Sequence, residues 1–224
     1  MAYKIKPSIR GLIVAVTLLC SLVMIAFIAL LSVLFQDQQQ QQSFAQQMNN
    51  MGPMSGSMGY ANYTTSTFVT YQNATMNIKI GYPSVWKTTE HISANTKVLE
   101  FIAPPESHMD TFPPVVTVSV RNLTLSNNVT LDMYTKENLN EAKRSLPSFE
   151  LVESNDTTLS NLKAHKIVYT FVSPNPSAQL HFQTMNIWTI QDDKVYTFTY
   201  SDSRLEYSRH LPIIQKMVDS FKII

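Results

Sequence analysis

The apolar run from Gly11 to Phe35 constrains this chain more than any other feature of its sequence. It holds no Asp, Glu, Lys or Arg over 25 residues, and Lys4, Lys6 and Arg10 stand just before it. A helix of that length rises about 37 Å, more than the roughly 30 Å hydrocarbon core of a bilayer. Basic residues beside a span favour the cytoplasmic side. We therefore expect a cytoplasmic N-terminus over residues 1–10, a transmembrane anchor over 11–35, and a C-terminal part outside the cell membrane.

A cleaved secretory signal is the alternative interpretation of this run. Signal peptides carry an apolar stretch of roughly 7–15 residues, closely followed by small residues at the cleavage site. Ser43-Phe44-Ala45 has the small-x-small pattern, but it ends ten residues beyond Phe35. Cys20 is preceded by Leu19, whereas a lipoprotein signal has a small residue there. The length of the run and the distance to Ala45 favour an uncleaved signal anchor over cleavage.

Residues 36–67 have a composition that cannot form a packed core. Gln38–Gln42 is an uninterrupted glutamine run, and Gly52, Pro53 and Gly56 follow it. Segments with so few large apolar side chains stay unfolded because they bury too little surface. We expect a flexible Gln- and Met-rich linker between the anchor and the rest of the chain.

Residues 68–224 are long enough for one domain with a real core. Cys20 is the only cysteine of the chain, so this domain forms no disulfide and has no thiol nucleophile. After the apolar run, 14 Lys and Arg residues stand against 16 Asp and Glu residues, with no basic block. That balance gives nucleic-acid binding no electrostatic support.

Short runs with β-type alternation dominate the domain, as in Met76–Tyr82, where apolar and polar residues alternate. The predicted strands are Phe68–Tyr71, Met76–Tyr82, Lys97–Ala103, Val115–Leu123, Glu150–Asn155, Leu162–Phe171, Gln179–Ile190 and Val195–Tyr200. Thr130 is a good N-cap for a helix over Leu131–Ser145, and a closing helix begins near Leu211 and ends at Ser220. Strands and helices without βαβ alternation predict an α+β fold with an antiparallel sheet.

Four segments of the domain together form a pattern that resembles a known family. Ile78–Trp86, with the sequence IKIGYPSVW, is a strand followed by Tyr-Pro-x-x-Trp, and Val218–Ile223 is a helix end followed by a short strand. Ile187–Thr189 and Val195–Thr199 are paired late strands. Over about residues 68–224 this pattern resembles the PsbP-like family, which comprises the extrinsic oxygen-evolving-complex subunit PsbP and its non-photosynthetic relatives. The resemblance implies an α/β/α sandwich around a central antiparallel sheet, and a non-catalytic role in binding or assembly.

Two groups of residues are candidate metal ligands. The first consists of the linker methionines Met48, Met51, Met54 and Met58, whose thioethers suit Cu(I); the alternative is a low-complexity tail. The second is His108, with Glu106 and Asp110, in a proline-bounded loop. Such a loop could hold a divalent ion or contact a partner, and its alternative is a solvated loop tip. We expect no resident cofactor, with copper or calcium as the alternatives.

Five N-x-[ST] triplets follow the apolar run, against roughly three expected by chance. They begin at Asn62, Asn73, Asn122, Asn128 and Asn155. Their excess agrees with an external glycoprotein, because these triplets are acceptors for N-linked sugars in secreted domains.

Catalytic motifs are missing from the sequence. It contains no G-x-S-x-G, no H-E-x-x-H and no glycine-rich phosphate loop, and its five histidines are scattered. We expect a membrane-tethered, non-catalytic binding or assembly module that works in a membrane protein complex. The alternatives are copper handling through the linker methionines and a cell-surface hydrolase, which would need Ser, His and Asp side chains brought together by the fold.

Overall fold

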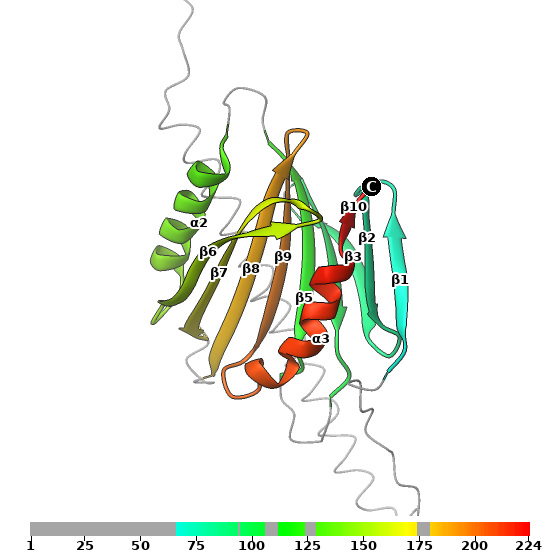
Figure 1. The fold of residues 1–224 in the computed structure, drawn as a ribbon. Helices are drawn as coiled ribbons and strands as arrows, with labels where there is room; N and C mark the ends of the chain where they lie inside the picture. The colour runs from blue at the N-terminus through cyan, green and yellow to red at the C-terminus, as the bar shows by residue number, and fades with distance from the viewer. Residues whose placement is uncertain (1–65, 94, 106–111, 124–128, 174–179) are drawn as a thin grey trace, which may run out of the picture. The chain divides into compact units, whose positions relative to one another are not determined.

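The computed structural model describes residues 66–224, apart from 94, 106–111, 124–128 and 174–179. The chain divides into two units, Met1–Met58 and Gly59–Ile224, and the described residues lie in the second. That unit consists of antiparallel strands and two helices (Figure 1). None of the described helices is long and apolar enough to cross a membrane. The predicted anchor, Gly11–Phe35, lies outside the described residues.

A seven-stranded sheet forms the centre of this unit, and each strand is antiparallel to its neighbours. In order across the sheet, the strands are β3 (Lys87–Ser93), β4 (Thr96–Ile102), β5 (Val115–Asn122), β9 (Lys194–Ser203), β8 (His181–Gln191), β7 (Leu162–Val172) and β6 (Glu150–Leu159). Two-residue turns join β6 to β7 and β8 to β9, and both of their central residues have positive φ. That geometry matches the right-handed twist of the strands. The second of these turns is Asp192-Asp193.

A three-stranded sheet lies beside it, with β2 (Ile78–Pro83) between β1 (Phe68–Asn73) and β10 (Lys222–Ile223). The backbone N–H of Gly81 donates to Ser220 Oγ at 2.8 Å. A Cβ at position 81 would come within 3.2 Å of that oxygen, so any larger residue would require the Ser220 side chain to shift by a few tenths of an ångström. The two end segments that suggested the PsbP-like family therefore touch each other in the fold.

One helix packs on each face of the large sheet. Helix α2 (Leu131–Ser145) begins at Thr130, whose Oγ1 accepts from the N–H of Met133 at 3.2 Å, as predicted. On the sheet face that α2 covers, Trp188 Nε1 of β8 donates a hydrogen bond to Thr135 Oγ1 of the helix at 3.0 Å. Helix α3 (Tyr207–Ser220) packs on the opposite face, where it shares the main core with Ile187, the neighbour of Trp188. Successive strand residues point to opposite faces, so β8 contacts both helices.

Of the two aromatic residues in the Tyr-Pro-x-x-Trp element, Trp86 is in the core and Tyr82 is partly buried against it. Trp86 is 3% exposed. The ring of Tyr82 packs on that of Phe101, with centroids 4.8 Å apart. These contacts attach the segment after β2 to the large sheet.

Two predictions of secondary structure, one for a strand and one for the start of a helix, were wrong. The sequence did not predict β3, because this edge strand is polar and mostly exposed and so shows no apolar alternation. Helix α3 begins at Tyr207 rather than near Leu211, and Pro212 lies inside it. Tertiary contacts hold its first turn, because the ring of Tyr207 stacks on that of Tyr200 at 4.8 Å.

Candidate functional site

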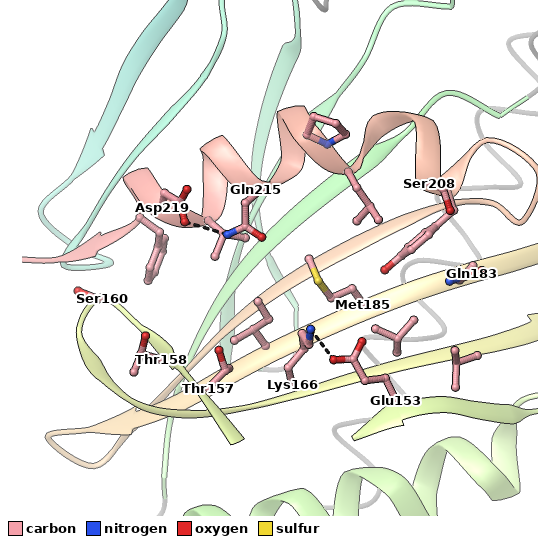
Figure 2. Close-up of a pocket in the computed structure, with 18 of the residues that line it drawn as sticks. Glu153, Thr157, Thr158, Ser160, Lys166, Gln183, Met185, Ser208, Gln215 and Asp219 are labelled. Carbon is pink, nitrogen blue, oxygen red and sulfur yellow. Dashed lines mark hydrogen bonds and ion pairs between the residues drawn. The ribbon is translucent and has the colours of Figure 1, made fainter. Parts of the chain in front are cut away.

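A groove of about 730 Å³ lies between helix α3 and the long hairpin formed by β6 and β7 (Figure 2). Strands β7 and β8 form its floor and α3 forms one wall. Its apolar lining comes from Val168, Met185, Ile187, Leu211, Val218 and Phe221. Its polar lining includes Glu153, Lys166, Gln183, Tyr207, Ser208 and Asp219. The groove therefore combines an apolar floor with charged and hydrogen-bonding groups.

A β-bulge in β6 directs Glu153 to the groove. Leu151 pairs with Tyr169, and the next pair is Glu153 with Val168, so Val152 is the extra residue. Paired residues of an antiparallel ladder share a face, and Val168 lines the groove. Without the bulge, Glu153 would lie on the opposite face of the sheet.

Glu153 forms a compact ion pair on the groove floor. Lys166 Nζ lies 2.5 Å from Glu153 Oε1, and Asn155 Nδ2 donates to the same oxygen at 2.8 Å. The hydrogen bond from Lys166 is the main cause that lowers the pKa of Glu153, against the opposing effect of burial. Glu153 is therefore a carboxylate at neutral pH.

Tyr207 places a phenol at the same end of the groove. The residue is 3% exposed, and its side chain lines the groove. Burial raises the pKa of Tyr207 above its ordinary value, and the charges of Glu153 and Asp202 raise it further. The hydroxyl thus stays protonated in a region of negative potential.

A buried polar cluster holds the start of α3 behind Tyr207. Asp202 Oδ2 lies 2.6 Å from His210 Nδ1 and accepts from Tyr200 Oη at 2.9 Å, and Asp202 Oδ1 accepts from the N–H of Ser203 at 2.7 Å. Arg209 donates to His210 Nε2 at 3.3 Å, so Nδ1 carries the proton toward Asp202. Because every named atom already has a partner, this cluster fixes the wall of the groove.

A second polar group lies on the opposite face of the hairpin. Ser154 Oγ is 2.9 Å from His165 Nε2, and His165 Nδ1 is 3.0 Å from Asp156 Oδ1. The hydrogen bond to His165 lowers the pKa of Asp156. These atoms follow the order of a serine–histidine–aspartate triad. No spacing along the chain predicts this group, because the register of β6 against β7 brings the residues together.

Most of the predicted site residues fall outside the described residues. They are Met48, Met51, Met54, Met58, His108, Asn62 and Asn128. Among the described residues, no group of three or more His, Cys, Asp or Glu side chains could hold a metal ion. Copper or calcium binding therefore stays a prediction.

The three described sequons differ in the hydrogen bonds that the side-chain amide of each asparagine donates. Asn73 Nδ2 donates to Tyr71 Oη and to Glu90 Oε2, both at 3.0 Å, so a sugar there would break these bonds. Asn155 Nδ2 donates to Glu153, while Asn122 is exposed at the end of β5. Among the described sequons, a sugar on Asn122 would thus break the fewest of these hydrogen bonds. Glycosylation itself stays a prediction.

The sequence profile of the PsbP-like protein family matches residues 16–223. The chain therefore belongs to the PsbP-like protein family, as the resemblance predicted. The match begins inside the apolar run, well before residue 68, where the resemblance was expected to start. No curated protein sequence matches the chain.

Solved structures similar to this chain include cyanobacterial PsbP (CyanoP) from Synechocystis sp. PCC 6803. It has a TM-score of 0.50 and 14% identity over 78% of this chain and 99% of that one. LpqN of Mycobacterium tuberculosis, described as involved in cell envelope biogenesis, has a TM-score of 0.49 and 12% identity over 76% and 98% of the two chains. The Ran-binding protein Mog1p of Saccharomyces cerevisiae has a TM-score of 0.47 and 9% identity over 71% and 96%. The likeness to cyanobacterial PsbP confirms the PsbP-like α+β fold.

Proposed function

We propose that the chain is a single-span membrane protein whose extracytoplasmic PsbP-like domain binds a partner protein through the groove between α3 and the β6–β7 hairpin. The apolar run Gly11–Phe35 and the basic residues before it support this location and orientation. In this proposal the domain is an assembly module without a catalytic role. In this proposal the flexible linker over residues 36–67 lets the domain extend away from the bilayer surface.

The groove is the observation that supports binding most directly. It places an apolar floor beside a buried phenol and an ion pair, and binding sites commonly combine such surfaces. The bulge at Val152 also supports a binding site here, because β-bulges often redirect side chains next to functional sites. The buried cluster around Asp202 keeps the wall rigid, as a preformed site requires.

Photo-crosslinking in intact cells tests the groove as the contact site. A benzoylphenylalanine replaces Ser208, which is exposed and lines the groove, and in a matched variant it replaces Lys136, which is exposed on α2. We expect a discrete crosslinked partner from position 208 and none from position 136. Equal crosslinking at both positions, or none at position 208, would contradict the proposal.

A cell-surface hydrolase is the second candidate function, and the Ser154–His165–Asp156 group favours it. With its Nδ1 proton held by Asp156, His165 Nε2 can take the proton of Ser154 Oγ as that oxygen attacks an ester carbonyl. Ser154 is exposed and so open to an external substrate.

A fluorophosphonate probe distinguishes this candidate from a simple cross-strand hydrogen-bond network. A working triad predicts covalent labelling of the chain that is lost in Ser154→Ala and retained in Ser208→Ala. If the wild-type chain is not labelled, or if Ser154→Ala is labelled as strongly, the hydrolase is excluded.

A further inference from the structure

Leu205, in the turn between β9 and α3, is the most exposed large apolar residue that the structure describes. It is 92% exposed. Arg204, the residue before it, is also exposed and forms no ion pair with a described residue. Glu206, the carboxylate after it, is held by Arg209, whose Nε lies 2.8 Å from Glu206 Oε2. The turn therefore presents an apolar side chain next to an available cation.

A second pair of this kind lies at the same end of the large sheet. Val85, between β2 and β3, is 44% exposed. Lys87, at the start of β3, is exposed and has no ion pair among the residues that the structure describes. Across the sheet, the residues in register with Lys87 are Ile102, Val115 and Ser201. Lys87 is thus level with the end of β9, three strands or about 14 Å away from it.

The chain also enters the domain at this end. The N–H of Ser84, next to Val85, donates to the carbonyl oxygen of Thr67 at 2.8 Å, directly before β1. Figure 1 shows the start of β1 and the turn between β9 and α3 at the lower end of the domain, and β10 near the upper end. The linker and the predicted anchor both precede Thr67 in the chain. A bilayer that holds this anchor is therefore connected to the domain at the end that carries Val85 and Leu205.

The two pairs have the chemistry of a membrane-surface contact. Apolar side chains that reach the boundary between headgroups and acyl chains leave water. Arginine and lysine side chains can keep their charges at the level of the lipid phosphates, and an arginine can bind a phosphate through two hydrogen bonds. An uncharged protein surface would use the apolar side chains but leave the two cations without partners. An anionic lipid surface uses both.

We propose that this end of the domain rests on the anionic phospholipid surface of the membrane that holds the anchor. In this arrangement Leu205 and Val85 lie at the boundary between headgroups and acyl chains, and Arg204 and Lys87 bind lipid phosphates. The inference rests on the anchor of the proposed function and adds a second, reversible contact with the membrane. Two apolar side chains and two cations bind a free bilayer weakly, but a flexible linker supplies an effective concentration on the order of millimolar. The domain therefore alternates between the surface and an extended position.

Environment-sensitive fluorescence of the full chain in lipid nanodiscs tests this contact. Cys20, the only cysteine, is replaced by serine, and a cysteine labelled with nitrobenzoxadiazole is introduced by Leu205→Cys or, as the matched control, by Ile92→Cys. Ile92 is 75% exposed and lies toward the other end of β3. In nanodiscs that contain phosphatidylglycerol, emission from position 205 should be about threefold that from position 92, because the label leaves water. Spin-labelled lipid should quench position 205 alone.

Charge variants show whether the cations contribute. Fluorescence lifetimes at position 205 give the ratio of surface-bound to free label. Replacement of both cations, Arg204→Gln with Lys87→Gln, should lower this ratio about thirtyfold, since each basic residue near an anionic surface contributes about fivefold. Nanodiscs of phosphatidylcholine alone should have a similar effect on the unaltered cations. Lys136→Gln, exposed on α2, should leave the ratio unchanged, and the emission of the two buried tryptophans reports that each variant is folded.

Equal emission from positions 205 and 92, or equal binding in anionic and uncharged nanodiscs, would overturn the inference. Crosslinking of a partner from position 208 would then still support the proposed function. A chain that does not stay with the nanodiscs would instead refute the anchor of the proposed function, and the inference would fail with it. The two failures are therefore distinguishable.

Discussion

Asp202→Asn should lower the free energy of unfolding by about 2–4 kcal/mol, because it leaves buried donors facing each other. In the wild type, Tyr200 and His210 donate to Oδ2 of Asp202, and Ser203 donates to Oδ1. An asparagine has only one oxygen. Whichever way its amide is turned, its NH₂ group meets at least one of these donors.

Urea unfolding, followed by the fluorescence of the chain's two tryptophans, measures this loss of stability. Asp219→Asn, on helix α3, is the matched control. Asp219 is exposed, and its Oδ1 accepts from Gln215 at 2.8 Å, a bond that an asparagine oxygen can keep. A cost below about 1 kcal/mol for Asp202→Asn, similar to that of the control, would show that the cluster does not hold α3 in place.

Glu100→Gln should raise the free energy of unfolding by about 1–2 kcal/mol at pH 7. Glu100 lies between Thr89 and Thr117 in the large sheet and is 4% exposed. Its Oε2 is buried without a hydrogen-bond partner among the described residues. Burial raises the pKa of Glu100, and the charge of His91 opposes that effect. The folded state therefore carries the cost of a poorly solvated carboxylate.

The pH dependence of the gain identifies its cause. Since the pKa of Glu100 is higher in the folded state, the folded state binds its proton more tightly, and wild-type stability falls as the pH rises through that range. The gain from Glu100→Gln should thus be full at pH 7 and vanish below about pH 4, where glutamates of the unfolded chain are protonated as well. Glu150→Gln, which is exposed, should show no such dependence. A gain that is equal at pH 4 and pH 7 would point to packing instead of charge.

The sequence correctly predicted those parts of the fold that interactions between residues close together in the chain determine. The helix over Leu131–Ser145 and its Thr130 cap were predicted residue for residue, because capping and apolar spacing are short-range properties. Strand β3 was missed because a polar edge strand is defined by its pairing with β4. The start of α3 depends on contacts with Tyr200 and Asp202. Both residues lie outside the short sequence segment around Pro212 from which the start of the helix was predicted.

The groove could not have been predicted from the sequence. Glu153 and Lys166 are ordinary charged strand residues, and only the bulge at Val152 places them together on the groove face. A bulge is a property of two paired strands, so a single strand's pattern does not reveal it. Tyr207 has no sequence signature either, because its burial comes from stacking on Tyr200 and from packing in the main core.

The pairing of β2 with β10 also has a consequence for the order of folding. The pairing places Lys222 opposite Lys79 and Ile223 opposite Ile78, and the nearby hydrogen bond from Gly81 to Ser220, at the end of α3, joins residues 139 apart in the chain. Contacts of such long range are entropically expensive to form early, and the ribosome must release almost the whole domain before they can form at all. We expect the three-stranded sheet to close last, so that its formation marks completion of the domain.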